Sequence, residues 1–359
     1  MGDYTARYWH AAENGRLQCD LCPRKCTLSN GQHGVCLVRM RKDDRMILTT
    51  YGRVSSACVD PIEKKPLYHF YPGSGILSIG TIGCNLTCRF CQNSSISRAS
   101  DLKLLQPEAG PEIVAQTARK LGCKSVAFTY NDPVVFAEYA MDVADACHAL
   151  DIRTVAVTAG YMCREARRDF YSRMDAANVD LKAFSDEFYT KLSGVRLQPV
   201  LDTLTYLKHE TAVWLEITTL LIPGWNDSDD ELTSMATWIR RELGPEVPLH
   251  FSAFWPTYKL TDVPPTPVET LVRARDIARR SGLHYVYIGN LRHAEGATTS
   301  CPTCNLPLIA RDGHQINLYK LSATGSCPQC ATAIAGHFDP SPGNFSGQRQ
   351  PLIFNKGNG

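Results

Sequence analysis

The sequence predicts an α/β fold built on a mostly parallel sheet, either open or rolled into a barrel. Short apolar runs suited to buried strands alternate with amphipathic helical stretches over the middle of the chain. The runs lie at residues 76–81, 125–129, 153–158, 179–183, 213–222, 249–254 and 285–288. The clearest helical stretches are residues 112–121, 134–150, 229–243 and 267–281. Because this alternation favours parallel pairing, we expect one sheet with helices packed against it.

The regions on either side of this core differ in composition. Residues 1–75 are irregular and rich in cysteine, and we expect the regular core to span residues 76–290. Residues 291–300 have the composition of a linker, and residues 301–336 form a small unit with paired cysteines. Residues 337–359 are rich in Pro and Gly, which predicts an extended or disordered tail.

The overall composition excludes several classes of protein. The 359 residues include 38 Lys and Arg against 36 Asp and Glu, so the net charge of +2 argues against a phosphate-coating, nucleic-acid-binding protein. No apolar run approaches the roughly 18 residues that a membrane helix needs. The first residues contain no apolar signal segment, so we expect the reducing cytoplasm as the compartment.

The most informative residue type is cysteine, which occurs 15 times. In a reducing compartment, clustered cysteines indicate metal or iron–sulfur ligands and not a disulfide framework. Three clusters stand out: Cys19, Cys22, Cys26 and Cys36; Cys84, Cys88 and Cys91; and Cys301, Cys304, Cys327 and Cys330.

The central cluster has the spacing C-x3-C-x2-C and follows the first expected core strand, at the edge where α/β folds carry their chemistry. Three thiolates on one tight loop can hold three irons of a [4Fe–4S] cluster, which leaves the fourth iron open. S-adenosylmethionine (SAM) can chelate such an iron through its amino and carboxylate groups and be cleaved reductively to a 5′-deoxyadenosyl radical. A three-ligand zinc site and unrelated cysteines are the alternatives.

With the aromatic Phe90 before its last cysteine, this motif resembles the radical SAM signature. From residue 19 to about residue 336 the chain resembles the AmmeMemoRadiSam-system radical SAM enzymes, which are relatives of pyruvate formate-lyase activating enzymes. The resembling segments are residues 19–23, 60–73, 84–91, 180–184, 222–227 and 285–290. The resemblance implies a partial (β/α)6 barrel with SAM bound across its open top. It also implies Memo-like and Ammecr-like pathway partners, because their genes often neighbour those of these enzymes.

Polar residues after the expected strands are candidates for SAM binding. Asn131 and Asp132 follow the second strand, where polar acceptors suit the SAM amino group, although Asn-Asp-Pro is also a turn former. Family members usually carry Glu at the position of Asp132. Asp180 and Lys182 are two residues apart and should share one face of the fourth strand. The resemblance favours their contact with the SAM carboxylate or ribose, and a buried structural ion pair is the alternative.

Two further polar residues lie inside expected strands. Glu216 occupies the middle of an apolar strand, where a charge is costly unless it is paired or functional, so we expect it on the SAM or substrate side. His250 should face the barrel mouth, although a lone His is often a satisfied core residue.

The C-terminal cysteines form two C-P-x-C knuckles separated by 22 residues, 305–326. Four thiolates in this pattern favour a structural zinc ribbon, with an auxiliary iron–sulfur cluster as the alternative. Only Arg311 and Lys320 carry fixed positive charge between the knuckles, so a lid facing a protein or substrate is favoured over nucleic acid.

The N-terminal four cysteines, Cys19, Cys22, Cys26 and Cys36, also predict a metal site. Zinc is the first interpretation, and a second [4Fe–4S] cluster or a set of reduced thiols remains open, because spacing alone does not choose the metal.

Three functions follow. The first is a radical SAM enzyme that takes one electron from an external reductant and abstracts hydrogen from an unidentified small-molecule or protein substrate. The second is an activase that generates a glycyl radical on a partner enzyme. The third is a non-enzymatic zinc-binding interaction protein.

Overall fold

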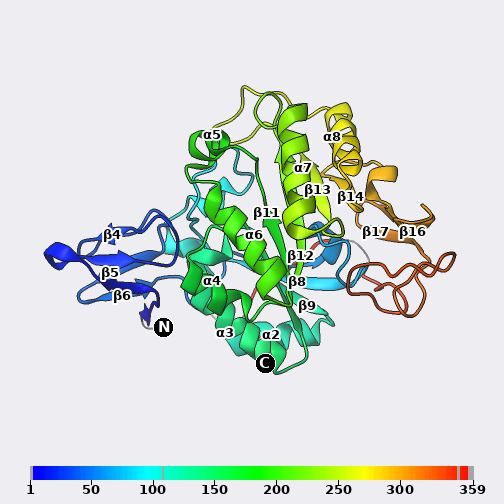
Figure 1. The fold of residues 1–359 in the computed structure, drawn as a ribbon. Helices are drawn as coiled ribbons and strands as arrows, with labels where there is room; N and C mark the ends of the chain where they lie inside the picture. Colours follow the sequence, from blue (N-terminus) through cyan, green and yellow to red (C-terminus); the bar gives the residue numbers. More distant parts are fainter. Residues whose placement is uncertain (1–2, 107–108, 346–347, 355–359) are drawn as a thin grey trace.

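The computed structural model describes residues 3–106, 109–345 and 348–354 (Figure 1). Its centre is a nine-stranded sheet with the order β14-β13-β12-β11-β10-β9-β8-β7-β18. Strands β8 to β14 follow one another in chain order and pair in parallel. Their bounds are β8 Gly75–Gly80, β9 Ser125–Phe128, β10 Arg153–Thr158, β11 Ala176–Asp180, β12 Trp214–Leu221, β13 Leu249–Ala253 and β14 Val286–Gly289. The expected α/β fold with a mostly parallel sheet is therefore confirmed.

Helices between these strands cover the face of the sheet that is turned to the viewer in Figure 1. The longer ones are α2 Pro111–Lys120, α3 Ala137–His148, α4 Arg164–Tyr171, α6 Gln198–Glu210, α7 Asp229–Leu243 and α8 Val268–Arg280. Helix α7 shows how the sequence sets the ends: Ser228 caps the first turn by accepting from Glu231 N–H, and Gly244 ends the helix at a φ of 96°. Short helical segments are η1 Glu13–Gly15, η2 Ile62–Lys64, α1 Ser94–Ser97, η3 Leu102–Leu104, η4 Pro133–Phe136, α5 Asp186–Phe188, the π-helix η5 Tyr189–Ser193 and η6 Glu295–Ala297.

The fourth parallel strand differs from its expected range of 179–183. Strand β11 begins at Ala176 and ends at Asp180, so Lys182 lies beyond its end. Alanine and asparagine at 176–178 are weak strand formers, but pairing with β10 and β12 on both sides overrides that preference.

The N-terminal region builds two small antiparallel sheets and also completes the core. The order β1-β6-β5 makes one sheet, and β2-β3-β4 makes the other. Their bounds are β1 Tyr4–Thr5, β2 Trp9–Ala11, β3 Leu17–Cys19, β4 Thr27–Leu28, β5 Arg39–Lys42 and β6 Arg45–Leu48. Strand β7 Ser56–Pro61 instead pairs antiparallel with β8, so the expected boundary at residue 75 cuts through the central sheet. Its almost wholly buried side chains explain why it joins the core.

The C-terminal part is also more ordered than expected. Strands β15 Thr299–Ser300, β16 Pro307–Asp312 and β17 Gln315–Tyr319 form one antiparallel sheet, so the expected linker 291–300 ends inside this unit. Within the expected tail, β18 Gln350–Pro351 pairs with Cys58 and Val59 of β7, and Gly343 N–H donates to the Pro72 carbonyl at 2.9 Å. Residues 346–347 and 355–359 lie outside the described residues.

Within residues 3–106, 109–345 and 348–354, no helix has the length and apolar character needed to cross a membrane.

Candidate functional site

The loop with Cys84, Cys88 and Cys91 directly follows β8 at the carboxyl edge of the parallel sheet. All three cysteines line one cavity of about 260 Å³. The ends of β9 to β13 meet them there through Thr129, Tyr130, Asn131, Asp132, Thr158, Ala159, Asp180, Lys182, Thr218, Leu220 and Ser252. The sheet therefore gathers three thiols and a ring of polar groups around a single space.

Asn131 fixes the start of this loop. Its Oδ1 accepts from Thr81 N–H at 3.0 Å, and its Nδ2 donates to the carbonyls of Ile82 at 3.1 Å and Gly83 at 2.8 Å. The side chain is buried, and its donors and acceptor are used by backbone immediately before Cys84. Asn131 thus positions the cysteine loop, and this role accounts for its hydrogen bonds. Its predicted contact with SAM stays a prediction.

The other end of the loop rests on the π-helix Tyr189–Ser193. Thr87 N–H donates to the Ser193 carbonyl at 2.9 Å, and Arg89 N–H donates to the Leu192 carbonyl at 2.8 Å. Gly194 follows at a φ of 70°, and a Cβ there would lie 2.0 Å from Thr87 Oγ1. Only glycine allows this approach, so the loop is held on both sides.

Asp132 joins the ends of β9 and β10. Its Oδ1 accepts from Val134 N–H at 3.1 Å and Thr158 Oγ1 at 2.8 Å, and its Oδ2 accepts from Ala159 N–H at 3.0 Å. Burial raises the pKa of Asp132 in spite of these donors. The turn interpretation accounts for these contacts, and binding of the SAM amino group by Asp132 stays a prediction.

Asp180 and Lys182 both reach the cavity, with 2.8 Å between Asp180 Oδ2 and Lys182 Nζ. Burial opposes the charged ammonium, but the Asp180 carboxylate outweighs it and raises the pKa of Lys182. Lys182 is therefore a retained positive charge beside the cysteine loop. Its place beyond β11 corrects the expectation that both residues share one strand face, although both still meet in the cavity.

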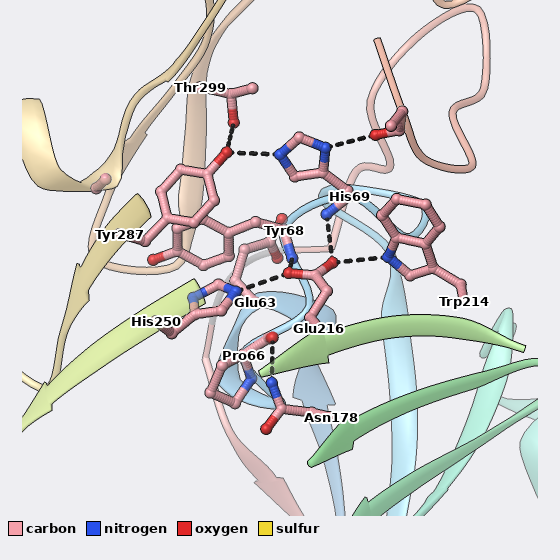
Figure 2. A network of polar contacts seen from close by, with 12 residues as sticks. Glu63, Pro66, Tyr68, His69, Asn178, Trp214, Glu216, His250, Tyr287 and Thr299 are labelled. Atoms are coloured by element: carbon pink, nitrogen blue, oxygen red, sulfur yellow. Dashed lines mark hydrogen bonds and ion pairs between the residues drawn. The ribbon is translucent and has the colours of Figure 1, made fainter. Parts of the chain in front are cut away.

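Glu216 and His250 are not among the residues that line the cysteine cavity, so their predicted role in cofactor binding stays a prediction, and His250 lines the adjoining cavity described below. Figure 2 shows the Glu216 carboxylate at the centre of a buried network. Its Oε1 accepts from His69 N–H at 2.8 Å and Trp214 Nε1 at 3.0 Å. Its Oε2 accepts from Tyr68 N–H at 3.0 Å and contacts His250 Nε2 at 2.7 Å.

The position of Glu216 along β12 explains why it does not line the cysteine cavity. Glu216, Thr218 and Leu220 share a strand face because side chains repeat every second residue. Thr218 and Leu220 line the cavity, whereas Glu216 is fully buried two residues earlier, where it accepts from the backbone N–H groups of residues 68 and 69. Burial opposes its charge, but the bond to His250 and the nearby histidines lower the pKa of Glu216.

A second cavity of about 900 Å³ adjoins the first, and the two share Gln92, Thr218 and Ser252. Its lining includes His250, Glu63 and residues 310–314 of the C-terminal unit. The C-terminal unit therefore forms part of the wall of this cavity, and its role as a lid facing a protein or substrate stays a prediction.

Two residues that line this cavity, Glu63 and Arg311, were not among the predicted site residues. Glu63 is buried, accepts from Gly73 N–H at 2.8 Å, and lies 3.8 Å from Arg311 Nε. Burial raises the pKa of Glu63 to about 7, although Arg311 opposes the shift. The Pro-bounded charged and aromatic segment 60–73 was the available signal, but it also fitted a solvated turn.

The C-terminal cysteines converge on one point. Cys301 and Cys330 have their sulfurs 3.4 Å apart, and those of Cys304 and Cys327 are 3.6 Å apart. All four sulfurs lie within 4.8 Å of one another. This arrangement can hold a metal ion, as the paired knuckles predicted.

The fold and the three-thiol cavity define a cluster-bearing α/β enzyme. Residues 78–236 match the family model of the radical SAM superfamily. An uncharacterized protein of Methanocaldococcus jannaschii is 38% identical over 330 residues, which cover 92% of this chain and 98% of that protein. The pyruvate formate-lyase 1-activating enzyme of Escherichia coli K12 is 25% identical over 215 residues, covering 56% of this chain and 87% of that enzyme.

Among solved structures, a domain of the pyruvate-formate lyase-activating enzyme from Bacteroides vulgatus matches with a TM-score of 0.41 and 17% identity, over 46% of this chain and 99% of that one. The chain belongs to the radical SAM superfamily and is a relative of the activating enzymes. It is an enzyme, and the third expected function, a non-enzymatic zinc protein, is set aside. Membership implies a [4Fe–4S] cluster and SAM, and the three thiols that share the cavity are a ligand set that fits such a cluster.

Proposed function

We propose that this enzyme binds its [4Fe–4S] cluster through Cys84, Cys88 and Cys91 and cleaves SAM reductively to a 5′-deoxyadenosyl radical. That radical abstracts hydrogen from a substrate that is still unidentified, after an external reductant has supplied one electron. The observation that carries the proposal is the convergence of the three thiols with the strand ends around one cavity of about 260 Å³. The bound cluster and SAM supply the radical chemistry, and the protein supplies position and exclusion of water.

The residues of the cavity have distinct tasks in this proposal. The ammonium of Lys182, held by Asp180 at 2.8 Å, provides positive charge for the SAM carboxylate, and Asp180 remains the candidate for the ribose. Asn131 and Asp132 hold the loop and the strand ends in place. The SAM amino group is then bound by polar groups at the sheet edge that these two residues position. The adjoining cavity of about 900 Å³ is the proposed substrate site.

We place the enzyme with the AmmeMemoRadiSam-system group, with Memo-like and Ammecr-like proteins as pathway partners. Support comes from the resembling segments that run from residue 19 to about residue 336. The C-terminal four cysteines are proposed to hold structural zinc, because Zn–S bonds of about 2.3 Å in a tetrahedron place sulfurs about 3.8 Å apart. The observed separations of 3.4 and 3.6 Å are close to that value.

A second candidate function is activation of a glycyl radical enzyme. The similarity to the Escherichia coli activating enzyme supports it. The 4-hydroxyphenylacetate decarboxylase activating enzyme of Clostridioides difficile also matches, at 24% identity over 119 residues. In that case the substrate is a glycine-bearing loop of a partner protein that reaches the same cavity.

The test is anaerobic reconstitution followed by addition of dithionite and SAM. We expect the native protein to release 5′-deoxyadenosine, and Cys88→Ala to release none because one iron ligand is lost. Cys123→Ala, a matched lone cysteine outside the cavity, should release the nucleoside as the native protein does. Release by Cys88→Ala would refute the ligand assignment, and its absence from a native protein loaded with iron and sulfide would refute the reaction.

A further inference from the structure

The N-terminal cysteines surround a small space of their own. Cys19 ends β3, and its N–H donates to the Cys26 carbonyl at 2.9 Å, while Lys25 N–H donates to the Cys22 carbonyl at 3.1 Å and closes the intervening turn. Together with Cys36, these cysteines line a cavity of about 20 Å³. A cavity needs roughly 10–15 Å³ to hold one water molecule, so this cavity is slightly larger than that minimum.

The spacing of these four sulfurs differs from that of the C-terminal set. Within the described parts of the chain, no three of the N-terminal sulfurs lie within 4.8 Å of one another, whereas all four C-terminal sulfurs do. Ligands of a single zinc ion must approach to about 3.8 Å because they share one tetrahedron. Ligands of a four-iron cluster sit on separate irons and are necessarily further apart.

Two arginines place positive charge at this cavity. Arg39 is fully buried and pairs with Glu138, with Arg39 Nη1 2.9 Å from each carboxylate oxygen. Its Nε, and Nη2 of Arg24, are buried and have no partner among the described residues, although both residues line the cavity. Unpaired buried donors are costly unless a ligand accepts from them. Sulfide and thiolate sulfurs of a negatively charged cluster are suitable acceptors.

The same cavity lies against the loop of the radical cluster. Asn85 lines the N-terminal cavity, while its neighbour Cys84 lines the SAM-side cavity. Arg24 donates through Nε to the Asn85 carbonyl. A Cβ on Gly83 would lie 2.1 Å from the Cys36 carbonyl, so the two cysteine segments touch through backbone. Adjacent residues of one loop, Cys84 and Asn85, therefore line the two cavities.

We propose that Cys19, Cys22, Cys26 and Cys36 bind a second [4Fe–4S] cluster, next to the loop of the radical cluster. Four thiols supply its protein ligands, and the free guanidinium nitrogens of Arg24 and Arg39 donate to its sulfurs. The C-terminal set, with its close sulfurs, binds a single ion. This assignment takes the second of the interpretations that the sequence left open for the N-terminal set, in place of zinc.

The test uses the full-length chain with Cys84, Cys88 and Cys91 all changed to Ala, reconstituted anaerobically with iron and sulfide. We expect about four iron and about four sulfide per chain to remain, against about eight of each in the native protein. The electron paramagnetic resonance signal of the dithionite-reduced variant should be unchanged by SAM. Bound zinc in place of iron, or four thiols that react freely with an alkylating reagent, would overturn the proposal.

A complementary pair of variants guards against simple misfolding. Cys22→Ser in the otherwise native chain should lower iron from about eight to about four while zinc stays constant. Cys304→Ser should lower zinc and leave iron unchanged, and Cys123→Ala should change neither. If the native protein released no 5′-deoxyadenosine but the triple variant kept its iron and sulfide, the proposed reaction would fail and the second cluster would stand. Equal loss of iron in Cys22→Ser and Cys123→Ala would contradict the assignment.

Discussion

Replacing Glu216 by Ala tests whether this carboxylate is structural or binds SAM. Four groups, two backbone N–H groups and the Trp214 and His250 side chains, converge on this fully buried carboxylate (Figure 2). Each buried donor left without an acceptor costs roughly 1–3 kcal/mol, and water admitted to the vacated space offsets part of this. We therefore expect Glu216→Ala to lower the free energy of unfolding by about 4 kcal/mol, near the range for breaking a buried charged pair.

Urea denaturation followed by circular dichroism measures this effect. With a slope of roughly 3–4 kcal/mol per M for a chain of this size, the midpoint should fall by roughly 1 M. Glu165→Ala, at an exposed position of α4, is the matched control and should shift the free energy by less than about 0.5 kcal/mol. A midpoint equal to that of Glu165→Ala, together with a loss of SAM binding, would refute the structural role and restore the role in cofactor binding.

Two further predictions concern buried polar groups. The pKa of Glu63 is raised from 4.5 to about 7, so the folded state binds more protons between these values and loses stability as pH rises through that window. Glu63→Gln should therefore match the native free energy of unfolding at pH 5 and exceed it at pH 8, by about 3 kcal/mol for a pKa raised by about 2.5 at 1.36 kcal/mol per pKa unit. A difference that does not change with pH would exclude this explanation. Asn131→Asp removes the donors to the Ile82 and Gly83 carbonyls, so we expect about 2–4 kcal/mol of destabilisation and loss of half or more of the reconstituted iron, with exposed Asn317→Asp as control. Full iron retention in Asn131→Asp would show that the loop does not depend on this amide.

The sequence predicted the parallel core well because its strands are short apolar runs flanked by amphipathic helices. Helix α7 matches its expected bounds, and α2, α3 and α8 deviate mainly at their ends. Helix α6 was not predicted although its buried Val200, Leu201, Leu204 and Leu207 follow helical spacing. Helix α4 was missed for a different reason, since five of its eight residues, Arg164, Glu165, Arg167, Arg168 and Asp169, are charged and its apolar signal is short.

The site residues were predictable where the ligands lie close together in the sequence. They were not predictable where their surroundings depend on contacts between distant parts of the chain. The central and C-terminal cysteine motifs lie where their spacing indicated, because close residues on a turn must meet. Glu216 and His250 contact each other in a buried network instead of lining the cysteine cavity. The sequence contains no local sign of this network, because the contact between His69 and Glu216 joins residues that are 147 positions apart.

The pairing of β18 with β7 has a consequence for biosynthesis. Val59 of β7 faces Gln350 of β18, so one edge of the central sheet stays unpaired until 291 further residues have been added. At roughly 5–20 residues per second, that interval lasts roughly 15–60 s on the ribosome. During this time the nascent chain carries an exposed strand edge, which invites pairing with other chains. Chaperone dependence in the cell should therefore be set by the last strand to emerge and not by assembly of the parallel core.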